Sequence, residues 1–242
     1  MKRENNFMDK YSKVELVLIY SGIAIFLTFI LLPFFEMFMT SLRPLDHLFR
    51  APYQFWSDDF SFEAYHKMWE TVPLLGRYIW NSVYISSMVT LLTMILIIPA
   101  AYAFARLDFP LKNVTLSMFL GVNMFTGAVL LIPLYRVLRT LGLLNTYWAM
   151  IIPGVAFLIP IGIWLLKPYF EKIPRELEEA AFVDGAGRLY TLGRIVLPLS
   201  IPGLIVVGVA VFIGAYAQQF LFAITFNQTR EYQPLPAGLY EF

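Results

Sequence analysis

The sequence of 242 residues contains no cysteine, only two histidines and few charged residues. Without cysteine the chain can form no disulfide, no thiolate metal site and no cysteine nucleophile. His47 and His66 lack the spacing of a metal-ligand pair and are interpreted as surface or interface residues. Charged residues make up 14% of the chain, whereas soluble domains carry about 25%. This deficit argues against a water-soluble fold.

The chain contains long runs of residues without a charged side chain. Apolar residues account for 59% of the chain and aromatic residues for 17%. Candidate transmembrane helices need roughly 18 apolar residues, and the runs of that length cover 16–35, 79–105, 114–135, 140–166 and 195–229. Prolines inside the last two runs indicate helix ends or kinks and place those helices near 146–166 and 200–225. The sequence therefore predicts an all-α fold, a polytopic transmembrane helix bundle with five spans.

The distribution of lysine and arginine predicts the orientation of these spans. Basic residues gather in the N-terminal tail and in the links between spans two and three and between spans four and five. All three regions lie on one side, which the positive-inside tendency identifies as the cytoplasm. The expected segments are a cytoplasmic tail (1–13), a first transmembrane helix (14–40), an external segment (41–77), and a core (78–242) with a cytoplasmic loop (167–198). A multi-pass protein of the bacterial cytoplasmic membrane with a cytoplasmic N-terminus is expected.

The loop over 167–198 is too regular to be a simple connector. Pro174 is suited to the first position of a short helix, acidic residues follow in its first turns, and Gly185 can adopt the left-handed conformation that ends it. A second short helix over about 188–196 would return the chain to the membrane at Pro198. The loop is thus predicted to form a cytoplasmic helix-turn-helix.

The first of these short helices has a face of small residues. Leu177 and Ala181 lie one turn apart, and Ala180 lies beside Ala181. Small side chains permit close approach by another surface, so we expect this helix to dock against a partner. An amphipathic helix on the membrane surface is the competing interpretation. Such helices are usually rich in lysine and arginine, whereas this one is rich in acidic residues.

The loop resembles the EAA motif of ABC importer permeases at each signature position. The matching residues are Glu179, Ala180, Ala181, Gly185, Ile195, Leu197 and Pro198. Further matches resemble carbohydrate permeases related to the smaller membrane subunit of the maltose importer; they lie at 81–83, 101–106, 109–110 and 141–147. Gly187 stands where relatives often have Ser or Thr, and Leu192 where an aromatic residue is frequent. Relatives have six spans, so the chain ending at Phe242 is expected to be truncated.

The resemblance implies a type I ABC importer permease fold with a coupling helix that inserts into a cytoplasmic ATPase. The residues implied in that contact are Glu178, Glu179, Ala180, Ala181, Asp184 and Gly185. The implied partners are a second permease subunit in a heterodimer, two cytoplasmic ABC ATPase subunits, an extracytoplasmic solute-binding protein and a sugar, either a mono- or an oligosaccharide. ATP and Mg²⁺ would bind to the partner ATPase, so this chain is expected to have no cofactor of its own and to be a transport subunit, not an enzyme. No nucleic-acid partner is expected at a formal net charge of +1.

Uncharged polar and aromatic residues within the spans are the candidates for contact with a sugar, which offers hydroxyls and ring faces. These substrate-path candidates are Asn123, Thr126, Tyr216, Gln218 and Gln219. Hydrogen bonding between packed helices is the competing role for each of them. No charged residue falls inside the predicted spans, which argues against a proton relay within this chain and for energy supplied by a partner.

Other function classes are open at this point. A permease for a solute other than a sugar would share the same motif. A purely structural membrane subunit would bind a cytoplasmic partner but have no substrate path. A membrane hydrolase or transferase would need a buried nucleophile with a base, or paired carboxylates, and the sequence has neither pattern.

Overall fold

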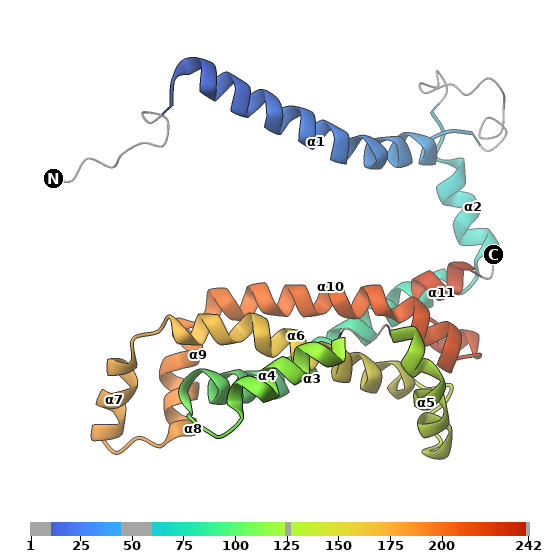
Figure 1. Ribbon diagram of the computed structural model, residues 1–242. Helices are drawn as coiled ribbons and strands as arrows, with labels where there is room; N and C mark the ends of the chain where they lie inside the picture. Colours follow the sequence, from blue (N-terminus) through green and yellow to red (C-terminus); the bar gives the residue numbers. More distant parts are fainter. Residues whose placement is uncertain (1–10, 45–59, 124–126, 241–242) are drawn as a thin grey trace. The chain divides into compact units, whose positions relative to one another are not determined.

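The computed structural model describes residues 11–44, 60–123 and 127–240, which contain helices and connecting segments but no strand (Figure 1). The chain divides into two compact units, Met1–Pro73 and Leu74–Phe242. Each unit is described by itself.

The first unit contains α1 (Lys13–Ser41) and α2 (Glu63–Thr71). A capping box starts α1, because the backbone N–H of Glu15 donates to Ser12 Oγ (3.3 Å) and the backbone N–H of Ser12 donates to the Glu15 carboxylate (2.7 Å). No residue of α1 is buried within the described part of the unit. An apolar helix of 29 residues with no buried residue among those described is suited to a lipid environment.

The second unit is built from helices that differ widely in length. They are α3 (Leu75–Arg106), α4 (Lys112–Asn123), α5 (Gly127–Thr140), α6 (Trp148–Glu171), α7 (Arg175–Val183), α8 (Arg188–Thr191), the π-helical turn η3 (Leu192–Val196), α9 (Leu197–Leu199), α10 (Ile201–Phe226), the 3-10 turn η4 (Arg230–Tyr232) and α11 (Leu235–Tyr240). The long helices α3, α6 and α10 pack against one another (Figure 1). Their buried side chains form the core of the unit.

The predicted transmembrane helix bundle is confirmed. Within the described residues α1, α3, α6 and α10 are each long and apolar enough to cross a membrane, and they match the runs predicted at 16–35, 79–105, 146–166 and 200–225. The prolines predicted to mark ends or kinks take two different positions. Pro153 and Pro160 lie inside α6, whereas Pro198 and Pro202 lie in the first turns of α9 and α10. The run predicted at 114–135 covers α4, the start of α5 and residues 124–126, which lie outside the described residues, so this span stays a prediction.

Glycines allow the three long helices to approach closely. Gly154 and Gly162 of α6 face Val89 and Ile97 of α3, and Gly203 of α10 faces the ring of Tyr169 on α6. Because lipid is as apolar as these side chains, helix association in a membrane relies on close van der Waals packing between small residues. The glycines thus supply part of the attraction that soluble proteins obtain from hydrophobic burial.

At the end of the second unit that lies away from α7, buried polar side chains form hydrogen bonds between α3 and later segments of the chain. Asn81, at the start of α3, is fully buried; it donates to the carbonyls of Glu231 (2.9 Å) and Gln233 (2.8 Å) and accepts from the Tyr147 hydroxyl (2.7 Å). Ser82 Oγ accepts the backbone N–H of Leu235 (2.9 Å). The segment after α10 is therefore attached to α3, which gives a structural reason for the Asn and Ser at 81–82.

Replacement of Gly203 by alanine should destabilise the bundle. A Cβ at this position would lie 2.5 Å from ring atoms of Tyr169, which cannot move away as the end of a flexible chain can. Overpacking of this kind costs about 1 to 3 kcal/mol. The measurement is the free energy of unfolding in mixed micelles, with Gly208→Ala as the matched control because nothing lies within 4 Å of its added Cβ. Equal stability of the two variants would contradict the close approach of α10 to α6.

Candidate functional site

The loop between α6 and α10 has the helix-turn-helix form predicted for it. The first helix, α7, begins at Arg175, with Pro174 in the N-cap position one residue before the helix, not in its first turn as predicted. Gly185 has φ +83°, the left-handed conformation predicted to end the helix. The backbone N–H of Gly185 donates to the carbonyl of Phe182 (3.1 Å) and that of Ala186 to the carbonyl of Ala181 (2.9 Å). These two bonds form a Schellman motif, which satisfies carbonyls at the end of α7.

The second helix of the loop has the predicted bounds but mixed geometry. The range 188–196 consists of one α-helical turn, α8, followed by the π-helical turn η3, which continues into α9. Gly187 is the N-cap of α8 and provides no side-chain cap, so the Ser or Thr frequent in relatives would add a hydrogen bond here. Leu192 is buried and belongs to the hydrophobic core. Both departures from the motif are accommodated by the fold.

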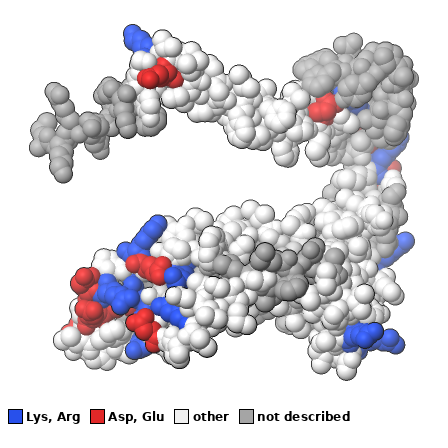
Figure 2. Space-filling model, in the orientation of Figure 1, with Lys and Arg blue, Asp and Glu red and all other residues white. Residues whose placement is uncertain are grey.

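Most residues predicted for the partner contact are accessible. Glu179, Ala180, Asp184 and Gly185 are exposed, and Ala181 is half-buried. On the face shown in Figure 2, charged side chains gather at the α7 and α8 end of the second unit, while the long helices present an uncharged surface. A hollow lies between α7, α8 and η3; its lining includes Leu177, Ala180, Ala181, Gly185, Tyr190 and Arg194. This arrangement can receive a partner surface against small side chains.

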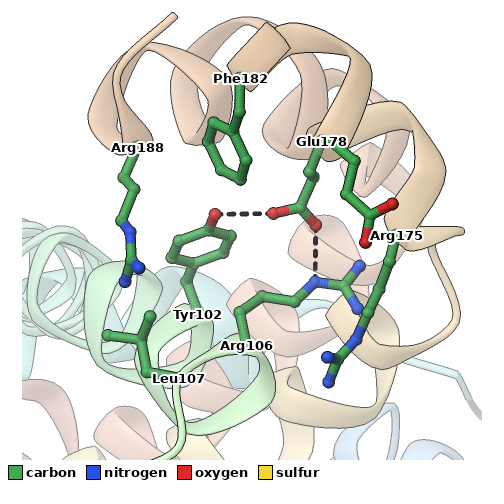
Figure 3. Close-up of a pocket in the computed structure, with 8 residues that line it drawn as sticks. Tyr102, Arg106, Leu107, Arg175, Glu178, Phe182 and Arg188 are labelled. Carbon is green, nitrogen blue, oxygen red and sulfur yellow. Dashed lines mark hydrogen bonds and ion pairs between the residues drawn. The ribbon is translucent and has the colours of Figure 1, made fainter.

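Glu178 is arranged differently from its neighbours. It is the one buried residue of α7, all of whose residues are described, and its carboxylate faces the end of α3. Figure 3 shows this carboxylate between two side chains of α3. The Tyr102 hydroxyl donates to Oε2 (2.7 Å), and Arg106 Nε lies 2.6 Å from Oε1 in an ion pair. In this structure the charge of Glu178 is paired within the chain, and its contact with a partner stays a prediction.

Arg106 makes a second contact with the same loop. Its Nη2 donates to the carbonyl of Ile173 (2.7 Å), just before α7 begins. The side chains of Arg106 and Glu178 are 7% and 5% exposed, so the pair is shielded from water. Arg106 is in the last turn of α3, where the helix dipole favours a positive charge.

Sequence reasoning identified the segment 101–106 by resemblance but assigned it no contact. Tyr102 and Arg106 are spaced i, i+4 and so lie on one face of α3. That spacing at the end of a predicted span, together with an acidic loop, was the available signal. The contact itself joins residues 76 positions apart and depends on the tertiary structure.

The substrate-path candidates that the structure describes differ in their surroundings. Gln219 is buried, and its Nε2 donates to the Ser82 carbonyl (2.8 Å) and to Ser86 Oγ (2.5 Å), which attaches α10 to α3. Gln218 is half-buried, and its Oε1 has no hydrogen-bond partner within the described ranges. Tyr216 is 38% exposed. Asn123 is the last residue of α4, but its side chain and the whole of Thr126 lie outside the described residues.

No metal site is found in the part of the chain that the structure describes, where no three His, Cys, Asp or Glu side chains come together. The site at α7 consists of one buried ion pair and an exposed small-residue surface. The ion pair can hold α7 in place, and the exposed surface of α7 is then available to a partner.

The chain is similar to known permease proteins along most of its length. It is 33% identical over 209 residues to the sulfoquinovosyl glycerol transport system permease protein SmoH of Agrobacterium fabrum, which covers 86% of this chain and 73% of that protein. It is 35% identical over 222 residues to the inner membrane ABC transporter permease protein YcjP of Escherichia coli, covering 91% and 79%. It is 39% identical over 162 residues to the trehalose/maltose transport system permease protein MalG of Thermococcus litoralis, covering 67% and 58%.

The fold is similar to that of a solved transporter. A chain in the crystal structure of a bacterial ABC transporter involved in the import of the acidic polysaccharide alginate matches with a TM-score of 0.76 and 23% identity. The match covers 96% of this chain and 81% of that one. No protein-family model matches the chain.

Replacement of Gly185 by alanine should loosen the end of α7. A residue with a Cβ in the left-handed conformation costs about 1 to 2 kcal/mol, so the Ala186 amide should exchange its hydrogen roughly tenfold faster. Hydrogen exchange measured by mass spectrometry on the loop provides the comparison. Gly187→Ala is the control, because Gly187 has an extended backbone and open space around it. Unchanged exchange in the Gly185 variant would contradict the Schellman turn.

Proposed function

Since the chain belongs to the permease proteins of ABC transporters, we propose that it is a permease subunit of an ATP-driven importer that moves a sugar, a mono- or oligosaccharide, across the inner membrane. The chain is a multi-pass membrane protein and a transport subunit, and ATP hydrolysis takes place in a separate ATPase. Support for a sugar comes from relatives named for sulfoquinovosyl glycerol and for trehalose and maltose. The observation that supports coupling to an ATPase most directly is the exposed small-residue surface of α7.

The proposed assembly places α7 at the cytoplasmic side. Two ABC ATPase subunits bind ATP and Mg²⁺, and one of them receives α7 against Ala180, Ala181 and Gly185. Glu179 is exposed beside these residues and can form a charge-assisted bond with a basic side chain of the ATPase. A second permease subunit completes a heterodimer in the membrane, and an extracytoplasmic solute-binding protein delivers the sugar. The N-terminus lies in the cytoplasm, in accordance with the basic residues of the tail.

The proposed mechanism is alternating access. ATP binding closes the ATPase pair, α7 moves with the ATPase surface, and the two membrane subunits change from an inward-open to an outward-open arrangement. Sugar and ATP then influence one another because both bias the same two-state element. No charged side chain within the spans is required for energy input, because the ATPase supplies it.

Among the substrate-path candidates whose side chains are described, Gln218 is the best placed to contact a sugar. Its Oε1 is buried and has no hydrogen-bond partner within the described ranges, so it can accept a bond from a sugar hydroxyl. Gln219, the next residue, points to α3 and holds Ser82 and Ser86. Oε1 of Gln219 also has no hydrogen-bond partner within the described ranges, so the two residues differ in their amide nitrogens: that of Gln219 is used in helix packing.

Replacement of Ala180 by tryptophan should abolish sugar uptake. A large ring on the exposed face of α7 would keep the ATPase surface from approaching the helix. The measurement is uptake by vesicles containing the complete importer with its binding protein, together with copurification of the ATPase. Ile205→Trp is the matched control, since Ile205 is 61% exposed on the apolar surface of α10. Normal uptake by the Ala180 variant would refute the docking surface.

Replacement of Gln218 by alanine should change which sugars are taken up, whereas replacement of Gln219 by alanine should lower the amount of folded protein. Loss of one hydrogen bond to a sugar costs about 1 kcal/mol, which corresponds to roughly a fivefold weaker apparent affinity. Uptake is measured with a panel of neutral and acidic saccharides, and folded protein by size-exclusion chromatography. An unchanged sugar preference in the Gln218 variant would remove Gln218 from the path.

A further inference from the structure

One side chain of α7 is buried against the bundle. Glu178 is the one buried residue among 175–183, and the remaining residues of α7 are exposed or half-buried. A helix of nine residues is too short to be stable alone in water. Its position is therefore set by the contacts of Glu178 and by the segments at its two ends.

The partner of Glu178 makes the attachment strong. A buried carboxylate without its counter-charge is costly, and removal of either partner of such a pair leaves an uncompensated charge. Oε2 of Glu178 accepts a hydrogen bond from the Tyr102 hydroxyl (2.7 Å). Oε1 lies 2.6 Å from Arg106 Nε in an ion pair that lacks hydrogen-bond geometry. α7 consequently resists any displacement that would separate it from α3.

Arg106 contacts the loop at two points, and this fixes orientation as well as distance. One point is the carbonyl of Ile173, before α7 begins. The other is the carboxylate of Glu178, in the middle of α7 (Figure 3). A single contact would leave α7 free to pivot about it. Two contacts five positions apart in sequence, with Tyr102 as a third, restrict that rotation.

The attached helix, α3, is connected to the other elements of the unit. Ser82 and Ser86 of α3 receive hydrogen bonds from Gln219 of α10, the neighbour of Gln218. Asn81, also in α3, binds the segment after α10 at the far end. A displacement of α3 is thus transmitted directly to α10.

We propose that Arg106, Tyr102 and Glu178 are positioning residues that make α7 and α3 a single mechanical unit, so that movement of α7 by the ATPase moves α3 and, through Gln219, α10. This inference rests on the proposed function as an ATP-driven permease. It assigns to Glu178 a role inside the chain, whereas Glu179, Ala180 and Ala181 meet the partner. Energy then reaches the sugar path through the membrane helix α3.

The first test compares sugar uptake per ATP hydrolysed in vesicles containing the complete importer. In Glu178→Gln the carboxylate charge is lost while the shape is kept, and uptake per ATP should fall about tenfold. Tyr102→Phe removes one hydrogen bond from the same site and should produce a smaller fall, about threefold. The ATPase should still copurify with both variants, because the partner surface of α7 is intact.

The matched control is Glu171→Gln. Glu171 forms an ion pair with Lys167 at the same distance, 2.6 Å, but its side chain is 43% exposed and the pair joins residues of α6 alone. The same substitution there should leave uptake per ATP unchanged. An equal fall in the Glu171 variant would show a general charge effect and overturn the proposal.

The second test measures movement directly. The chain has no cysteine, so spin labels can be placed in it through cysteines introduced at Val183 on α7 and Leu96 on α3, which are 88% and 49% exposed. In an otherwise unchanged, transport-competent chain the distance between the labels should be the same with and without ATP. In Glu178→Gln its distribution should broaden. A distance that changes with ATP in the unchanged chain would overturn the proposal, even where the Glu178 variant fails to fold.

The experiments distinguish a failure of the proposed function from a failure of the single mechanical unit. If the unchanged chain takes up no sugar of the panel with its binding protein and ATPase, the proposed function is wrong. If it takes up sugar and the Glu178 and Tyr102 variants keep the same uptake per ATP, the single mechanical unit is wrong and the proposed function stands.

Discussion

The buried contact of Glu178 with Arg106 determines how the loop between α6 and α10 is presented. A charge in apolar surroundings is stable only beside its counter-charge, so α7 packs on the bundle in the orientation that brings Glu178 to Arg106. That orientation leaves Ala180 and Gly185 on the outside. The exposed small-residue surface of α7 therefore depends on a contact between two nearly buried side chains.

Two kinds of helix contact hold the rest of the unit, and both fit a membrane environment. Glycines bring α3, α6 and α10 together where lipid offers no hydrophobic driving force. Hydrogen bonds from Asn81 and Gln219 then connect α3 to segments far along the chain. Apart from the approach of Gly203 on α10 to Tyr169 on α6, α3 takes part in these contacts, and it also carries Arg106. It is the helix through which the loop, the neighbouring span and the far end of the unit are joined.

Several features of this fold could be predicted from the sequence. The spans corresponding to α1, α3, α6 and α10, the helix α7 and the left-handed Gly185 all depend on local patterns of apolar, proline and glycine residues. Two features could not. Glu178 and Glu179 are adjacent and chemically identical, yet one is buried and the other exposed. Gln218 and Gln219 differ in the same way, since the second holds α3 and the first does not.

The sequence by itself determined that this chain is a membrane helix bundle, where its apolar helices lie and which loop carries the family motif, because length, apolar content and turn residues act within a few positions of one another. Only the tertiary structure decided which of two adjacent residues faces the protein. Neighbours on a helix point about 100° apart, so the choice depends on where another helix lies. For Glu178 that helix is α3, whose Tyr102 is 76 positions away in the sequence.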